Sequence, residues 1–264
     1  SNYEKLVGLD LAYNINNFST FSITMNPDFG QIEQDPSEIN LTGYETYFEE
    51  KRPFFIESSN IFNTPINIFY SRRVGGDVKL NYNSLDTLLN YRTDLNLALK
   101  LTGKSNNGIS YGLIAAESEI DSSKSIFDEN KIHTSTFRLA KDLFDGNSYF
   151  GFMDVYYDDG FSKSNIISFD GLFNFYNNKL NLDAQIINSY NKKESIESFD
   201  GNGVSMEISF KDKIENKVNF LNNKIFETWL NLEVFDDDLE IYNTGYLYRN
   251  DLKKIDFGIS IFHE

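Results

Sequence analysis

The chain has 264 residues, 40% of them hydrophobic and 16% aromatic, which is enough apolar surface for a substantial core or one closed β architecture. Its 40 acidic and 24 basic residues give a formal net charge of -16, and a surface this negative repels nucleic acid. The absence of cysteine excludes disulfides, thiolate zinc sites and cysteine nucleophiles.

Histidine content and hydropathy exclude further classes. His133 and His263 are too few for a histidine-rich metal or catalytic centre, so we predict no metal, no cofactor and no catalytic residue. No apolar stretch is long enough for a transmembrane helix, and the amino terminus lacks the charged-then-apolar pattern of a signal peptide. The abrupt start at Ser1, and the end straight after a strand-like run at 256–262, favour a fragment of a longer protein.

The first strand ends at Asn26-Pro27, because proline cannot continue a central ladder, and a polar inserted segment, residues 26–75, follows it. Its arginines are expected to fold back on its carboxylates, since buried carboxylates need partners. Phenylalanines and isoleucines between positions 48 and 62 favour a packed, partly buried segment over a solvated loop. The candidate ligand-binding or lumenal residues are Asp28, Glu33, Asp35, Glu45, Glu49, Lys51, Arg52, Arg72 and Arg73.

Two finer features are expected within this segment. Glu45 to Glu50 is predicted to form a short helical turn, with Thr42 and Glu45 in capping-box spacing. The crowded carboxylates also contain pairs that could act as acid and base in hydrolysis, although such chemistry requires a specific separation between them.

The rest of the chain alternates apolar and polar residues in the period of two that is typical of a β-strand with one buried face. Leu95, Leu97, Leu99 and Leu101 share one face of the first such run, and later runs repeat the pattern. Several runs are longer than the usual soluble strand of about five or six residues. They approach the roughly nine to eleven residues that cross a bilayer as a tilted strand. We expect about twelve to fourteen strands.

The connections between these runs alternate in length. Tight turns are predicted at 105–108, 145–147 and 177–178, where glycine and asparagine tolerate positive φ. Longer polar loops are expected at 117–131, 158–165 and 192–202, and aromatic pairs gather near strand ends. Short turns on one side and longer loops on the other are typical of an outer-membrane barrel, and aromatic girdles are expected at its interfaces. A soluble β-sandwich remains the alternative.

Other motifs carry little weight. Gly103-Lys104-Ser105 resembles the end of a phosphate-binding loop, but Ala98 stands where the first glycine is required. The acidic clusters at 158–159 and 236–238 lack the spacing of a calcium loop, so we interpret them as solvated charge.

The polar segment "NPDFGQIEQDPSEINLTGYETYFEEKRPFFIE", followed by "FYSRRVG", resembles the signature of a bacterial outer-membrane family of unknown function, domain of unknown function 5916. "LALKLTGKSNNGISYGLIAA", "FRLAKDLFDGNSYFGFMDVYY" and "YNTGYLYRNDL" follow in the family's order, so the resemblance covers most of the chain. Ser58 stands where the family usually has glycine. The resemblance implies a barrel-like region that usually follows a domain similar to family 9 carbohydrate-binding modules.

These observations predict an all-β, antiparallel, up-and-down transmembrane β-barrel, complete or partial, with the polar segment filling its lumen. Residues 1–264 would form a single barrel domain or a fragment of one. The expected location is the outer membrane of a Gram-negative bacterium, in contact with lipid. The expected function is to pass, bind or dock a glycan or small-molecule ligand, with no nucleic-acid partner. The alternatives are a carboxylate-dependent hydrolase at the membrane and a structural anchor for a carbohydrate-binding domain.

Overall fold

The structure is a computed structural model that describes residues 7–27, 44–76, 78–81, 88–91, 93–120, 131–193, 198–214 and 224–263. These residues contain thirteen strands, within the expected range, and a few short helical turns. The strands are β1 (Leu9–Asn16), β2 (Ser19–Met25), β3 (Val78–Asn81), β4 (Leu88–Tyr91), β5 (Thr93–Lys104), β6 (Ile109–Ile120), β7 (Lys131–Leu143), β8 (Ser148–Asp158), β9 (Ser162–Phe175), β10 (Leu180–Lys193), β11 (Phe199–Ile214), β12 (Lys224–Phe235) and β13 (Leu252–His263).

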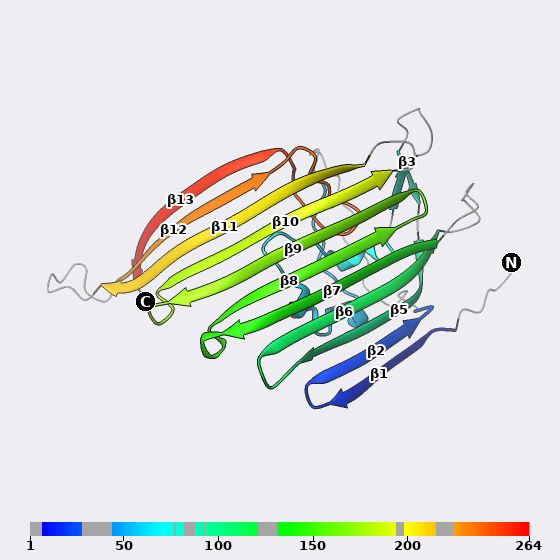
Figure 1. The fold of residues 1–264 in the computed structure, drawn as a ribbon, viewed down its shortest axis with the longest axis horizontal. Coiled ribbons are helices and arrows are strands. Elements are labelled where there is room, and N and C mark those ends of the chain that lie inside the picture. The colour runs from blue at the N-terminus through cyan, green and yellow to red at the C-terminus, as the bar shows by residue number, and fades with distance from the viewer. Residues whose placement is uncertain are drawn as a thin grey trace.

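One antiparallel up-and-down sheet of eleven strands dominates the molecule, in the order β1-β2-β5-β6-β7-β8-β9-β10-β11-β12-β13, and β3 pairs with β4 in a separate ribbon. The sheet is strongly curved, as Figure 1 shows from its convex side. The predicted all-β, antiparallel, up-and-down class is therefore confirmed. The described sheet is not closed, because β1 and β13 are its two edges. Within the described ranges, no helix is long and apolar enough to cross a membrane.

The predicted tight turns all join neighbouring strands at one end of the sheet, which we call the turn end. Gly108, Asp145, Asn177 and Asn178 have positive φ there. The opposite end, where the inserted segment follows β2 and residues 236–251 join β12 to β13, is the loop end.

Two of the predicted long loops at the loop end are wrong in length. β8 and β9 are separated by three residues, because the Asp159 carboxylate accepts hydrogen bonds from the backbone N–H of Phe161 and Ser162 and closes a tight turn. β10 continues to Lys193 and β11 starts at Phe199, so the loop predicted at 192–202 is mostly strand. Of the loop predicted at 117–131, residues 121–130 lie outside the described part of the chain.

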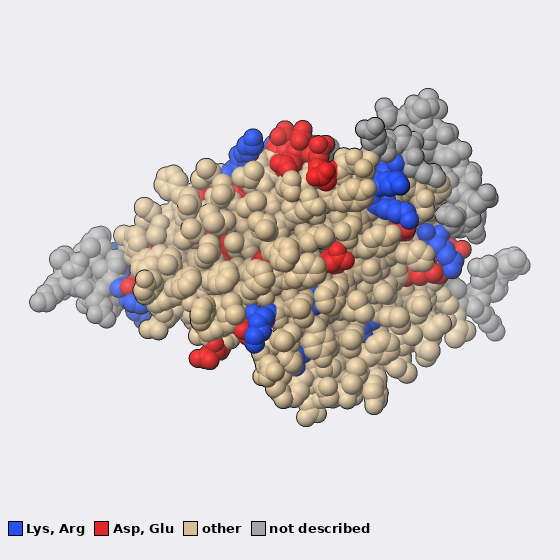
Figure 2. All heavy atoms as spheres, viewed as in Figure 1, with Lys and Arg blue, Asp and Glu red and all other residues tan. Residues whose placement is uncertain are grey.

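The two faces of the sheet have a reversed polarity, because the exposed convex face is mostly apolar while the buried concave face carries many polar residues beside apolar core residues. On β9, the concave face carries Ser168 and Asp170, both buried, while the convex face carries Ile167 and Phe169, both exposed. Convex residues lie in direct cross-strand register over four strands, as in the row Leu139, Phe152, Phe169 and Ile186. Most Lys, Arg, Asp and Glu side chains visible on this face lie toward the ends and margins of the sheet (Figure 2). The convex face is therefore a broad apolar band.

The concave face is covered in part by the inserted segment, which lies behind the sheet in Figure 1. Buried apolar residues of the segment form one cluster with apolar residues on β5, β6, β8, β9, β10 and β12 and in the loop 236–251. The main core of the described chain thus lies between the sheet and the insert. The members of this cluster from the insert are Phe55, Phe62, Ile66, Ile68, Phe69 and Val74.

Candidate functional site

The described part of the inserted segment, residues 44–76 and here called the insert, is mostly irregular. It contains α1 (Pro53–Ile56) and two 3-10 turns, η1 (Ser59–Phe62) and η2 (Ser71–Arg73). The helical turn predicted over Glu45 to Glu50 is wrong, because this stretch has no regular secondary structure. The Tyr70 hydroxyl explains the difference, since it accepts a hydrogen bond from the N–H of Phe48 and donates one to its carbonyl. The helix begins instead at Pro53, a residue suited to the first helical position.

Ser58 occupies a strained position between α1 and η1. Its φ is 57° and its ψ is 22°, the left-handed conformation that glycine adopts most easily. Glycine, which the resemblance described above implies at this position, would adopt this backbone with less strain.

Apolar side chains of the insert fit into space left by the sheet. Phe62 is buried against β6, where Gly112 faces it. A Cβ atom at Gly112 would come within 2.6 Å of the Phe62 ring. Glycine at this position therefore allows the insert to approach the strand closely.

Polar side chains of the concave face bind the insert's backbone. The ammonium group of Lys100 on β5 donates hydrogen bonds to the carbonyl oxygens of Phe54 and Glu57, the second at 2.7 Å. Gln185 on β10 accepts a hydrogen bond from the N–H of Ile66 and donates one of 2.8 Å to Ser168. An irregular segment buries backbone groups that have no ladder partner, and these strand side chains supply partners for three of them.

The insert also pairs with the loop at residues 236–251. The N–H of Tyr70 donates a 2.7 Å hydrogen bond to the carbonyl of Thr244, and the N–H of Tyr246 donates one of 2.8 Å to the carbonyl of Asn67. These two bonds join segments more than 170 residues apart in sequence, so the insert is held by both the sheet and the loop end.

The expectation that arginines fold back on carboxylates holds for two pairs. Arg52 binds both carboxylate oxygens of Glu50, at 2.9 and 2.7 Å, and donates further bonds to the carbonyls of Val74 and Ser71. Burial favours the neutral acid, but the hydrogen bonds and charge of Arg52 outweigh it and hold the pKa of Glu50 below its usual value. Glu50 was not among the predicted site residues, although it lies between two of them.

The second pair forms part of an aromatic cluster at the loop end. Arg73 binds both carboxylate oxygens of Glu45, at 2.8 and 2.6 Å, and its guanidinium lies 4.2 Å from the ring centre of Tyr242. Tyr47 stacks on Tyr70, with ring centres 5.1 Å apart. We call the following residues the rim cluster: Tyr44, Glu45, Tyr47, Tyr70, Arg73, Tyr242, Tyr246 and Tyr248.

The rim cluster combines exposed ring surface with ordered polar groups. Tyr44, Tyr47 and Tyr248 are exposed. Burial raises the pKa of the Tyr70 and Tyr246 hydroxyls, so both remain protonated donors at neutral pH, and the Tyr246 hydroxyl donates to the carbonyl of Glu45. Aromatic rings with polar tips are common where a protein meets another molecule.

The remaining predicted site residues are placed as follows. Arg72 donates a 2.9 Å hydrogen bond to the backbone carbonyl of Glu49, whose side chain is exposed. Lys51 donates its backbone N–H to Glu50. Asp28, Glu33 and Asp35, like the proposed cap Thr42, lie outside the described residues. Among the residues that the structure does describe, no three His, Cys, Asp or Glu side chains converge as metal ligands.

A buried ion pair on the concave face was missed from the sequence. Arg138 on β7 donates two hydrogen bonds to the Asp170 carboxylate on β9, one of them at 2.7 Å, and both side chains are buried. The Arg138 side chain reaches across β8 at Gly151, where a Cβ would come within 2.6 Å of its guanidinium nitrogens. The sequence did contain a sign of this pair. Arg138 and Asp170 each lie in the middle of a strand and alternate with the apolar residues of its convex face.

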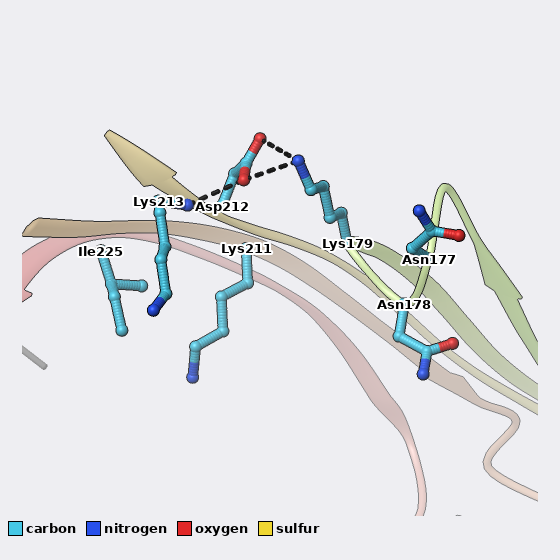
Figure 3. A pocket seen from close by; sticks show the side chains of 7 residues that line it. All are labelled: Asn177, Asn178, Lys179, Lys211, Asp212, Lys213 and Ile225. Carbon is cyan, nitrogen blue, oxygen red and sulfur yellow. Dashed lines mark hydrogen bonds and ion pairs between the residues drawn. The ribbon is translucent and has the colours of Figure 1, made fainter. Parts of the chain in front are cut away.

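A hollow of about 650 Å³ lies at the turn end, far from the insert. Figure 3 shows that Lys211, Lys213 and Ile225 point to one side of the sheet, while Lys179 and Asp212 meet on the other. The ion pair between Lys179 and Asp212 joins β11 to the turn before β10 and strengthens this end of the sheet.

Comparison with known protein families now identifies the group of proteins to which this one belongs. A family model described as a domain of unknown function, DUF5916, matches residues 1–261. The chain belongs to the DUF5916 family. The resemblance read from the sequence is thus confirmed over nearly the whole of this DUF5916 chain. No curated protein and no solved structure matches it.

Proposed function

We propose that this DUF5916 chain forms the wall of an outer-membrane β-barrel that docks a ligand at the rim of a lumen filled by the insert. The observation that carries the proposal is the reversed polarity of the sheet, with apolar residues on the exposed convex face and many buried polar residues, beside apolar core residues, on the concave face. Membrane barrels alternate apolar-out and polar-in along each strand. In a water-soluble sheet the exposed face would instead be the polar one.

The dimensions of the apolar band support the same proposal. β8 has 11 residues. At about 3.3 Å per residue and a tilt of about 45°, a strand of this length spans roughly 25 Å, the height of the lipid-facing band of such barrels. At the loop end, a cross-strand row of ionisable residues crosses the convex face where headgroups would begin. The row is Glu117, His133, Asp158, Lys163 and Lys192.

The packing of the insert favours docking over an open channel or catalysis. The insert lies on the concave face and its backbone is bound by Lys100 and Gln185, so it would occupy the lumen rather than leave a path through it. A general acid requires a raised pKa, whereas that of Glu50 is lowered. The rim cluster places exposed tyrosine rings beside the ion pair of Arg73 and Glu45. This combination suits a ligand with flat apolar faces and polar edges, such as a carbohydrate.

Membrane insertion is tested with a pair of exposed aromatic residues. Phe169, in the middle of the band, is 41% exposed, and Tyr176, in a turn outside the band, is 75% exposed. In lipid, Phe169→Lys is expected to cost about 2–4 kcal/mol of folding free energy, measured by urea titration in bilayers, while Tyr176→Lys changes it little. In a soluble sheet both exposed positions tolerate lysine, so equal and small effects would overturn the proposal.

Ligand docking is tested separately at the rim. Titration with a panel of oligosaccharides is expected to show binding that Tyr47→Ala and Tyr248→Ala weaken and that Tyr176→Ala leaves intact. If membrane insertion is confirmed but no sugar binds, or if the three variants behave alike, the docking role is wrong while the barrel assignment stands.

A further inference from the structure

The carboxyl-terminal edge of the sheet lacks the usual protection of an exposed strand. β13 has 12 residues and pairs with β12 in unbroken register. Its convex residues Ile255, Phe257, Ile259 and Ile261 are all apolar and exposed. Natural edge strands usually carry bulges, prolines or charges that prevent further pairing. The charged residues Lys253, Lys254 and Asp256 all lie near the start of β13, and the stretch 257–262 has none.

The amino-terminal edge is also exposed, although it has a register shift between Asn14 and Asn16 and one charged residue, Asp10. Among the described strands β1 pairs with β2 alone, and its convex residues Leu9, Leu11 and Tyr13 are exposed. All eight residues of β1 are exposed, on both faces. In hydrocarbon, the unpaired N–H and C=O groups of either edge would have no hydrogen-bond partner, and open sheet edges do not occur facing lipid.

Strand direction limits what can fill the gap between these edges. In an antiparallel up-and-down sheet alternate strands run the same way, so β1 and β13, the first and eleventh strands in the order, are parallel to each other. They cannot close on one another while keeping the antiparallel pattern that every other pair in the sheet follows.

The same argument disfavours a second copy of this chain. Two copies in one membrane share their orientation, with their turn ends on the same side. Any edge of one copy would then run parallel to any edge of the other, again against the pattern of the sheet. A copy turned upside down would restore antiparallel pairing, but it would place its loop end in the opposite leaflet.

We propose that an odd number of further amphipathic strands fills the gap between β13 and β1, and that the strand beside β13 runs antiparallel to it. This strand presents apolar residues opposite Ile255, Phe257, Ile259 and Ile261 on the convex face and polar residues on the concave face. The inference rests on the proposed membrane function, because only lipid makes both open edges untenable.

One position near the edge defines the register of the incoming strand. The indole ring of Trp229 on β12 lies over Gly258 of β13, where a Cβ would come within 2.5 Å of it. The residue that pairs with Gly258 from the far side therefore lies beside the indole. Because Trp229 is the one tryptophan of the chain, its fluorescence reports on this edge.

A strand peptide tests the proposal. The probe has the β12 sequence, Lys224–Phe235, with its tryptophan replaced by tyrosine, since β12 already complements the face pattern of β13. A single cysteine is introduced into the full chain as Ser260→Cys, on the concave face of β13. The peptide carries its cysteine either at the position of Glu227, which opposes Ser260 in antiparallel pairing, or at that of Asn231, which lies on the same face and would oppose it in a parallel pairing. Disulfide trapping is measured in lipid bilayers.

The expected result is trapping of the Glu227-position peptide alone, a blue shift of Trp229 fluorescence, and a monomeric mass for the chain. The control Ser209→Cys, on β11 between two paired strands, should trap neither peptide. Trapping of the Asn231-position peptide, a disulfide between two chains with doubled mass, or no trapping at all would each overturn the inference. The two failures can be distinguished. If Phe169→Lys destabilises the protein in bilayers as expected but no peptide is trapped, the proposed membrane function stands and only this inference is wrong.

Discussion

Replacing Lys100 by methionine should release the insert from the sheet. The Lys100 side chain is 2% exposed, and its ammonium group holds the carbonyls of Phe54 and Glu57 at the end of α1. Methionine preserves most of the volume and removes both bonds. Hydrogen bonds from a charged donor contribute about 1.5–3 kcal/mol each, so the gross loss is about 3–6 kcal/mol. The variant also avoids the cost of burying the lysine charge, and this offsets part of the loss. We therefore expect the insert to be held on the sheet less strongly by about 2–3 kcal/mol.

At about 1.4 kcal/mol per factor of ten, this cost shifts the opening equilibrium of the insert by roughly 30- to 150-fold. Hydrogen exchange of the backbone amides of residues 55–62 measures the shift directly. Lys104→Met is the matched control, because Lys104 lies on the same strand, is 54% exposed and pairs with Asp142 near the surface. Its expected cost is below about 0.5 kcal/mol. Equal exchange rates in the two variants would refute the docking role of Lys100.

Three further predictions address single contacts. Arg138→Met should destabilise the fold by about 3–5 kcal/mol in urea titration, because Asp170 remains buried without a partner, and adding Asp170→Leu should recover most of the loss. Ser58→Gly should stabilise the insert by about 0.5–1 kcal/mol in hydrogen exchange, since it relieves the left-handed backbone. The lowered pKa of Glu50 contributes stability above its usual pKa, and that stability is lost as pH falls toward the folded value. Acid should therefore open the insert, and Glu50→Gln should remove that pH dependence.

Sequence periodicity was sufficient to predict the strands but could not assign their faces. The alternation of Leu97, Leu99 and Leu101 with Ala98, Lys100 and Thr102 indicates a strand with two different faces. The same alternation is expected if the leucine face packs in the core of a soluble protein and if it faces lipid, because both environments are apolar. The structure resolves this point, since Lys100 and Thr102 are buried and Leu97, Leu99 and Leu101 lie on the convex side. The prediction that Leu95 shares their face is wrong, because the register shifts between Leu95 and Leu97 and Leu95 is buried in the core. A buried lysine requires a polar partner, and that partner lies more than 40 residues away in the insert.

The insert itself was predicted from composition, but its contacts could not be. Its phenylalanines indicated burial, and its charges indicated pairing between arginines and carboxylates. Which carboxylate each arginine would bind depended on the irregular path of residues 45–52, which the hydroxyl of Tyr70 holds at Phe48. Contacts to Thr244 and Gln185 come from distant strands and loops, so local propensity contains no information about them.

The reversed polarity of the sheet and the irregularity of the insert explain each other. Irregular backbone is tolerated at membrane depth only where protein or water supplies hydrogen-bond partners. A concave face of ordinary apolar residues would leave the carbonyls of Phe54 and Glu57 and the amide of Ile66 without partners, at a cost of several kcal/mol. Lys100 and Gln185 meet that need. In the proposed barrel, the polar residues of the concave face hold the insert, and the apolar convex face is free to contact lipid.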